Sequence, residues 1–234
     1  MCGRFTLILT PEMLAEIFGL TELPRIEPRY NIAPSQQVAA IRTLADNDHR
    51  EIAMLKWGLI PRWAKDPSIG HKMINARSES IHEKPAFRQA IRYHRCIIPS
   101  SGFFEWEEKG GKKYPLYVRL KDGAPMCFAG IWDHWKSLEG EIVESCSILT
   151  TSSNKLIEPL HERMPVILHP QEYALWLDRT INDPEKLKPL YQPYPADLME
   201  IWPVSPLVNS PRNDTPACIE QIVYENSNLV RYSE

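Results

Sequence analysis

The sequence predicts a single α+β domain, rich in β-strand, built around a curved, barrel-like mixed or antiparallel sheet that a few short helices flank. Three observations predict this class: many short apolar runs are separated by turn sequences, 21 prolines interrupt the chain throughout, and helical periodicity is confined to a few stretches. The 234 residues suffice for one sizeable core. We expect one domain over 1–234, with its core motifs in 2–168 and a C-terminal helical and loop segment in 169–234.

The expected strands are short runs rich in aromatic and branched apolar residues. They cover 4–9, 36–44, 51–60, 72–75, 95–100, 103–108, 114–120, 126–133, 143–151 and 164–169. Turn sequences at 108–114 and 120–126 indicate hairpins, because the first carries Gly-Gly and the second Asp-Gly. Residues 45–51 are expected to join two further strands.

The expected helices are few and have clear boundaries. The stretch 10–19 has Thr10 as N-cap, Pro11 in the first turn and Gly19 as its stop. Four more stretches are expected to be helical, with Pro159 distorting the second of them. They cover 84–94, 152–161, 169–177 and 182–191.

Composition excludes several classes of protein. Five widely spaced cysteines without a CxxC motif argue against a zinc site or a disulfide framework, and Cys96, Cys127 and Cys146 are expected to be small buried hydrophobic residues. No apolar run approaches the roughly 20 residues of a membrane-spanning helix, and no signal peptide is recognisable. We expect a cytoplasmic protein without cofactor, associated with the nucleoid when it is bound to DNA.

The charge is unevenly distributed, although the formal net charge is only −3. Between residues 56 and 95 there are nine basic and three acidic residues, so the rest of the chain is strongly acidic. Such a local basic patch can hold a short stretch of phosphates. Unremarkable surface charge explains the same distribution equally well.

Five positions carry polar or aromatic groups that a plain strand or helix does not require. Cys2 follows the initiator methionine, Asn75 interrupts a strand, and Trp63 lies beside basic residues, a mix that suits base stacking with phosphate neutralisation. Strand alternation places Glu105 on one face with Phe103, where an apolar environment raises a carboxyl pKa. Three of them also have a structural explanation: Trp63 as a loop tryptophan in the core, Glu105 as a glutamate facing water, and His161 as a structural histidine.

The chain resembles the SRAP family, named for SOS-response-associated peptidase. The matching segments run in order to about residue 168, and weaker similarity continues through PRNDTPACIE. They are MCGRF, RYNIAPSQQV, WGLIPRWAKD, INARSES, RCIIPSSGFFEW, GKKYPLYVRL, FAGIWDHW, ESCSILTTSSN and LHERMPVIL.

The resemblance implies a role for ten residues. Loss of Met1 exposes Cys2, which links covalently to abasic sites in single-stranded DNA; Asn75 holds its amine, Glu105 is the general acid/base, and His161 assists sugar opening and later proton steps. The positions that match the DNA groove are Arg4, Trp63, Arg77, Thr150 and Arg163, with Pro34 at the rim of the site.

An N-terminal cysteine suits this chemistry, because a neutral α-amine attacks the aldehyde of an open abasic sugar and the adjacent thiol closes a thiazolidine ring. We therefore expect a sensor of abasic sites with a linked self-cleaving peptidase and Schiff-base, lyase-like activity. Two alternatives stay open: a thiol peptidase of the N-terminal-nucleophile type that acts on other peptides, and a module that binds modified bases without chemistry. We expect a monomer whose partner is single-stranded DNA, with no membrane.

Overall fold

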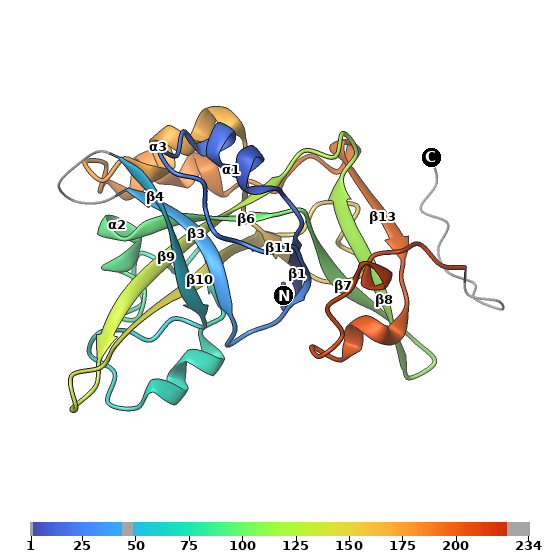
Figure 1. Ribbon diagram of the computed structural model, residues 1–234, viewed down its shortest axis with the longest axis horizontal. Coiled ribbons are helices and arrows are strands. Elements are labelled where there is room, and N and C mark those ends of the chain that lie inside the picture. The colour runs from blue at the N-terminus through green and yellow to red at the C-terminus, as the bar shows by residue number, and fades with distance from the viewer. Residues whose placement is uncertain (1, 44–48, 224–234) are drawn as a thin grey trace.

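The computed structural model describes residues 2–43 and 49–223, and it contains a closed barrel of five strands (Figure 1). Four neighbouring pairs are antiparallel, and the pair β4–β10 is parallel. The predicted β-rich α+β class with a barrel-like mixed sheet is therefore confirmed. The barrel strands are β3 (Gln37–Thr43), β4 (Arg50–Trp57), β6 (Arg95–Ser100), β9 (Met126–Lys136) and β10 (Ile142–Ser152).

Three short strands extend the barrel at its edges. The first pairs in parallel with β10, the second pairs antiparallel with β10, and the third pairs antiparallel with β9. They are β5 (Asn75–Arg77), β11 (Arg163–Pro165) and β12 (Ile167–Leu168).

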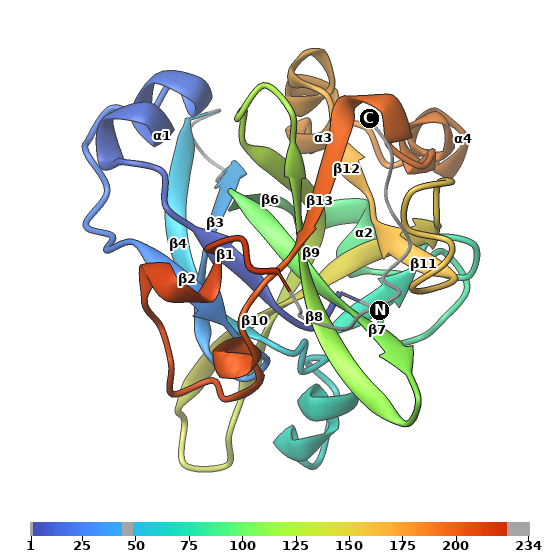
Figure 2. The ribbon, with the colours of Figure 1, turned by 90° about the vertical axis from the view of Figure 1, so that its right-hand side faces the viewer.

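A second, antiparallel sheet of five strands lies beside the barrel, and Figure 2 shows part of it in front. Its strand order is β13-β8-β7-β1-β2, so the first strand of the chain lies inside this sheet rather than at its edge. Its strands are β1 (Phe5–Leu7), β2 (Arg29–Ile32), β7 (Gly102–Lys109), β8 (Lys112–Leu120) and β13 (Met199–Pro203).

The helices are short. The predicted helix at 10–19 is confirmed as α1 (Pro11–Phe18), in which the Thr10 hydroxyl accepts from the Met13 amide and Gly19 adopts φ +63°. The other α-helices are α2 (Ala90–Tyr93), α3 (Tyr173–Leu177) and α4 (Pro184–Leu187). The 3₁₀ helices are η1 (Pro67–Lys72), η2 (Pro170–Glu172), η3 (Lys188–Tyr191), η4 (Ala196–Leu198), η5 (Pro206–Asn209) and η6 (Pro216–Cys218).

Several predicted elements were wrong in detail. The helix expected at 84–94 shrinks to α2, with turns before it, and the stretch 152–161 forms turns instead of a helix. The strand expected at 72–75 begins only at Asn75, because η1 occupies the residues before it. The predicted connection at 45–51 falls largely outside the described residues, although β3 and β4 pair as an antiparallel hairpin.

The core joins the two sheets through β1. The Phe5 ring from β1 packs edge-on against Trp57 of β4 and Phe128 of β9, with ring centroids 5.1 and 5.8 Å away. Strand alternation on β7 is as predicted: Phe103 enters this main core, and Phe104 enters a second, smaller cluster behind the five-stranded sheet.

Within the described residues, no helix is long and apolar enough to cross a membrane. All five cysteines are buried and carry free thiols. The expectation that Cys96, Cys127 and Cys146 are buried in the core is confirmed.

Gly102 allows β1, β7 and β8 to approach one another closely. A Cβ at this position would lie 2.4 Å from the Tyr117 hydroxyl and 2.5 Å from the Val118 carbonyl oxygen. The same Tyr117 hydroxyl is hydrogen-bonded to Thr6 of β1 at 2.8 Å. A side chain at residue 102 would therefore push apart the strands that seat the N-terminal segment.

We expect Gly102→Ala to lower the free energy of unfolding by about 1–3 kcal/mol, because the added methyl group overpacks a closed site. Urea denaturation followed by circular dichroism measures this change. Lys112→Ala, at an exposed position on the neighbouring strand β8, is the matched control. Equal stabilities of the two variants would contradict the close approach inferred at Gly102.

Candidate active site

Cys2 is fully buried, although it stands next to the end of the chain. The segment that follows it is tied to β7 by the Phe104 amide, which donates to the Arg4 carbonyl oxygen at 3.0 Å. Burial raises the pKa of the Cys2 thiol far above its usual value, and the nearby Glu105 carboxylate raises it further. The thiol is thus protonated at rest, and a base must remove its proton before it can act as a nucleophile.

Asn75, the first residue of β5, holds the backbone of Cys2. Its Nδ2 donates to the Cys2 carbonyl oxygen at 2.9 Å. Its Oδ1 is buried and has no hydrogen-bond partner among the residues that the structure describes. Nδ2 of the side-chain amide therefore fixes the position of Cys2, and Oδ1 of the same amide is a buried acceptor without a partner in the described part of the chain.

Glu105 comes from the middle of β7 and is only 4% exposed. Burial raises the pKa of its carboxyl group to about 7. The prediction from strand alternation, a glutamate on an apolar face, is confirmed over the alternative in which it faces water. A carboxyl group with this pKa can both give and take protons near neutral pH.

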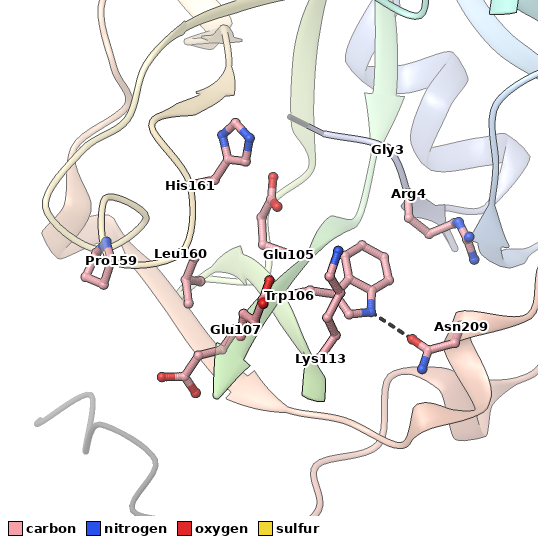
Figure 3. Close-up of a pocket in the computed structure, with 11 residues that line it drawn as sticks. Gly3, Arg4, Glu105, Trp106, Glu107, Lys113, Pro159, Leu160, His161 and Asn209 are labelled. Carbon is pink, nitrogen blue, oxygen red and sulfur yellow. Dashed lines mark hydrogen bonds between the residues drawn. The ribbon is translucent and has the colours of Figure 1, made fainter. Parts of the chain in front are cut away.

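His161 ends the 153–161 turns and lines the same pocket as Glu105 (Figure 3). The Arg163 amide donates to its Nδ1 at 2.9 Å, which requires Nδ1 to be unprotonated. Burial also lowers the pKa of His161 below its ordinary value. The ring is therefore neutral at pH 7 and carries its proton on Nε2.

Glu105 and His161 line an open pocket of about 760 Å³, together with residues of the N-terminal segment, β7 and β8. Figure 3 shows the Glu105 carboxylate pointing toward the N-terminal segment, with His161 and Leu160 on one side and Arg4 on the other. The pocket is lined by Gly3 and Arg4, the residues that follow Cys2, whereas Cys2 itself is fully buried.

Arg77, Thr150 and Arg163 meet at one edge of the barrel, as strand pairing requires. Arg77 of β5 pairs in register with Thr150 of β10, and Arg163 of β11 pairs with Ser152. Arg77 is solvent-exposed and lies 3.8 Å from Glu162.

Thr150 and Arg163 at this edge are buried. Arg163 forms a bidentate ion pair with Glu79 (2.6 and 2.8 Å) and also donates to the Thr150 carbonyl oxygen. Of the two arginines at this edge, Arg77 is thus the more accessible to a phosphate.

Arg4 lies on the opposite side of the pocket. Its Nη1 donates to the Asn31 side chain and to the Val208 carbonyl oxygen, both at 2.7 Å. Its guanidinium group also lies 5.9 Å from the Trp106 ring centroid. Arg4 therefore joins the pocket wall to the C-terminal segment, and its buried Nε has no partner within the described part of the chain.

Trp63 and Pro34 lie apart from the residues that line this pocket. Trp63 is 56% exposed, so the alternative of a tryptophan in the core is wrong. Pro34 precedes Ser35, whose φ of +71° is unusual for a residue with a side chain. The Ser35 hydroxyl contacts His71 Nδ1 at 3.1 Å, which links this turn to η1.

Four residues of the site were not identified from the sequence. Asn31 is buried and its Nδ2 donates to three carbonyl oxygens of the 208–213 segment; Glu79 holds Arg163; Trp106 and Asn209 line the pocket and are hydrogen-bonded to each other. Only Trp106 had a local signal, its place beside Glu105 on a strand. In the described parts of the chain, no group of three or more metal-binding side chains occurs.

Comparison with known proteins decides the family. Residues 1–211 match the family described as SOS response associated peptidase (SRAP). The chain belongs to the SRAP family. It is 46% identical over 224 residues to the abasic site processing protein YoqW of Bacillus subtilis, which covers 94% of this chain and 99% of YoqW. It is 30% identical to the abasic site processing protein HMCES of Mus musculus, over 94% of this chain and 75% of that one.

Solved structures share this SRAP fold. A protein from Bacteroides thetaiotaomicron has a TM-score of 0.85 at 28% identity and covers 95% of this chain and 100% of its own. A protein from Bordetella bronchiseptica has a TM-score of 0.76 at 29% identity, over 87% of this chain and 100% of that one. The family resemblance read from the sequence is confirmed.

We expect the stability of this SRAP protein to fall between about pH 4.5 and pH 7 through Glu105. The folded carboxyl group keeps its proton up to about pH 7, whereas the unfolded one releases it near pH 4.5, so in this window the unfolded state binds fewer protons. Relative to Glu105→Gln, the wild type should lose up to about 3 kcal/mol across the window. Urea denaturation of both proteins over this pH range measures the difference, and parallel profiles would contradict it.

Proposed function

We propose that this protein recognises abasic sites in single-stranded DNA and binds them covalently through Cys2 after Met1 has been removed. The observation that carries the proposal is the buried Cys2 backbone, hydrogen-bonded to Asn75 beside a carboxyl group of pKa about 7. Relatives that cover nearly the whole chain are named abasic site processing proteins, which supports the same substrate.

The covalent step needs an amine, a thiol and a proton carrier in one place. The Cys2 amine attacks the C1′ aldehyde of the open sugar, and loss of water gives an imine. The thiol then adds across the imine carbon and its proton ends on the nitrogen, which closes the ring with water as the only other product. Glu105 is suited to deliver and collect these protons, and the unused Oδ1 of Asn75 to accept from the amine.

His161 is suited to open the sugar. In its neutral form it carries a proton on Nε2, and it lines a pocket large enough to admit a deoxyribose. Donation from Nε2 to the ring oxygen of the closed sugar would help to release the aldehyde. The same group can later assist proton transfer to or from the crosslink.

Removal of Met1, which lies outside the described residues, is suited to self-cleavage. The nearness of Cys2 to Glu105, a carboxyl group that can act as a base, supports this route. Glu105 takes the thiol proton, Sγ attacks the Met1 carbonyl carbon, and the peptide bond breaks with a proton going to the Cys2 nitrogen. Water then hydrolyses the thioester and releases methionine. This reaction is the peptidase activity that we assign to the chain.

The DNA strand is held chiefly through phosphate and stacking contacts. Arg77 is an exposed cation at the barrel edge and Trp63 an exposed aromatic ring, which supports sequence-independent binding. Arg4, Thr150, Arg163 and Pro34 complete the proposed groove. We propose a monomer that acts on DNA in the cytoplasm or nucleoid.

We expect a purified wild-type protein to form a heat-stable adduct with a single-stranded oligonucleotide that contains one abasic site. Cys2→Ala should lose the stable adduct, and Cys2→Ser should give only a Schiff base that borohydride traps, because a hydroxyl group is a poorer nucleophile than a thiol. Glu105→Gln should slow the reaction about 100-fold. Denaturing gels and intact mass measure the adduct and the loss of Met1.

Cys218→Ala is the control for that experiment, since Cys218 is also a buried free thiol but lies in η6. An adduct that persists unchanged in Cys2→Ala would refute the covalent mechanism. Retention of Met1 in Glu105→Gln, with its loss in the wild type, would support self-cleavage.

We expect Arg77→Ala to weaken binding to single-stranded DNA and to reduce the slope of log affinity against log salt by about 0.7, as the loss of one phosphate contact does. Fluorescence anisotropy over a series of salt concentrations measures both changes. Arg119→Ala is the matched control, because Arg119 is paired with Glu200 on the other sheet. An unchanged slope in Arg77→Ala would remove this residue from the groove.

A further inference from the structure

Trp63 occupies the tip of a tight turn. The turn spans residues 61–64 and is closed by the Ala64 amide, which donates to the Pro61 carbonyl oxygen at 2.8 Å. Trp63 is 56% exposed, whereas Ala64 is almost fully buried. The ring therefore projects from a turn whose own backbone lies against the protein.

Three residues of the barrel form hydrogen bonds with this turn, one with each of residues 60, 62 and 64. The Ile60 amide donates to Ser145 Oγ of β10 at 2.8 Å. Arg62 donates to the Asp133 carboxylate from its backbone amide, its Nε and its Nη2, at 3.0–3.2 Å for the closest contacts. Trp135 Nε1 donates to the Ala64 carbonyl oxygen at 2.7 Å.

The anchors come from one patch of the barrel. Asp133 and Trp135 are alternate residues of β9, so their side chains leave the same face of the strand. Ser145 is the cross-strand partner of Asp133 on β10. They bind the residues on both sides of Trp63 but not Trp63 itself.

The carboxyl group of Asp133 stays ionised at neutral pH in this position. Its burial alone would raise its pKa, but the neighbouring His94 ring and the hydrogen bonds from Arg62 bring the pKa down to about 2. His94 lies 3.7 Å from the carboxylate and stacks on Trp132. Burial of a carboxylate carries a desolvation penalty, and a well-packed apolar group would stabilise the fold as well. Stability alone therefore does not explain this arrangement of donors.

We propose that Asp133 and Trp135 are positioning residues that hold the Trp63 turn rigid, so that the exposed ring is already oriented to stack on a base of the bound strand. The inference rests on the proposed function, in which Trp63 contacts single-stranded DNA. An immobile turn loses little conformational entropy when DNA binds, and this preorganisation appears as affinity. Neither residue touches the DNA in this arrangement.

A double-mutant cycle with an undamaged fluorescent oligothymidylate tests the proposal, because this probe measures binding without the covalent step. Trp63→Ala should weaken binding about tenfold, the loss expected for one stacked base. Asp133→Ala should weaken it about fivefold and Trp135→Phe, which removes only the indole donor, about threefold. In the Trp63→Ala background, both changes should cost less than about twofold, because they act only through that ring.

Glu144→Gln is the matched control, since it breaks a bidentate pair with Arg42 on the same barrel without touching the turn. It should leave DNA affinity unchanged. Asp133→Asn replaces Asp133→Ala if the latter fails to fold, and the adduct yield at saturating DNA should be that of the wild type for all positioning variants.

Full additivity of the Asp133 or Trp135 change with Trp63→Ala would overturn the proposal, as would unchanged binding by Trp63→Ala alone. If binding and coupling appear as expected but no adduct forms with abasic DNA, the covalent function fails and the positioning role stands. If the adduct forms but the coupling is absent, the positioning role fails and the covalent function stands.

Discussion

The structure depends on the seating of the N-terminal segment between the two sheets. The Phe104 amide donates to the Arg4 carbonyl oxygen and ties the segment to β7. The Asn75 side chain donates to the Cys2 carbonyl oxygen and ties Cys2 to β5. Phe5 then fixes the direction of the chain, because its ring is enclosed by aromatic side chains of the barrel. A chain end is ordinarily the least ordered part of a protein. Here four strands distant in sequence, β4, β5, β7 and β9, hold residues 2–5, and the thiol of Cys2 consequently lies beside Glu105.

The two sheets contribute different properties to the site. The five-stranded sheet supplies the buried acid, and its burial gives Glu105 a pKa near neutrality. The barrel supplies the amide of Asn75 and, along the same edge, the cation Arg77. Both sheets thus contribute to the candidate site: Glu105 lines the pocket from the five-stranded sheet, and Asn75 holds the Cys2 backbone from β5. A change in the packing between the sheets would alter the distance between Glu105 and Asn75.

The sequence was sufficient to predict those parts of the fold that depend on interactions between residues close together in the chain. The helix from Pro11 needs only its cap and its stop, and the environment of Glu105 follows from strand alternation. Strand β2 could not be predicted, because its amides at Tyr30 and Asn31 bind Asp214, more than 180 residues away. The 153–161 turns likewise depend on Asn154, whose side chain caps two amides and reaches Tyr194. The family resemblance named the candidate reacting residues, but the Glu79 pair of Arg163 required the structure.

The complete burial of Cys2 also determines how the protein meets oxidants. Peroxides attack thiolates, and the rate of oxidation follows thiolate content and solvent access. A thiol that is enclosed and held protonated offers neither, so Cys2 should outlast ordinary surface cysteines under oxidising conditions. The environment that would require a base in the proposed reaction is therefore also a protective one. In that proposal, Cys2 stays reduced until a neighbouring group removes its proton.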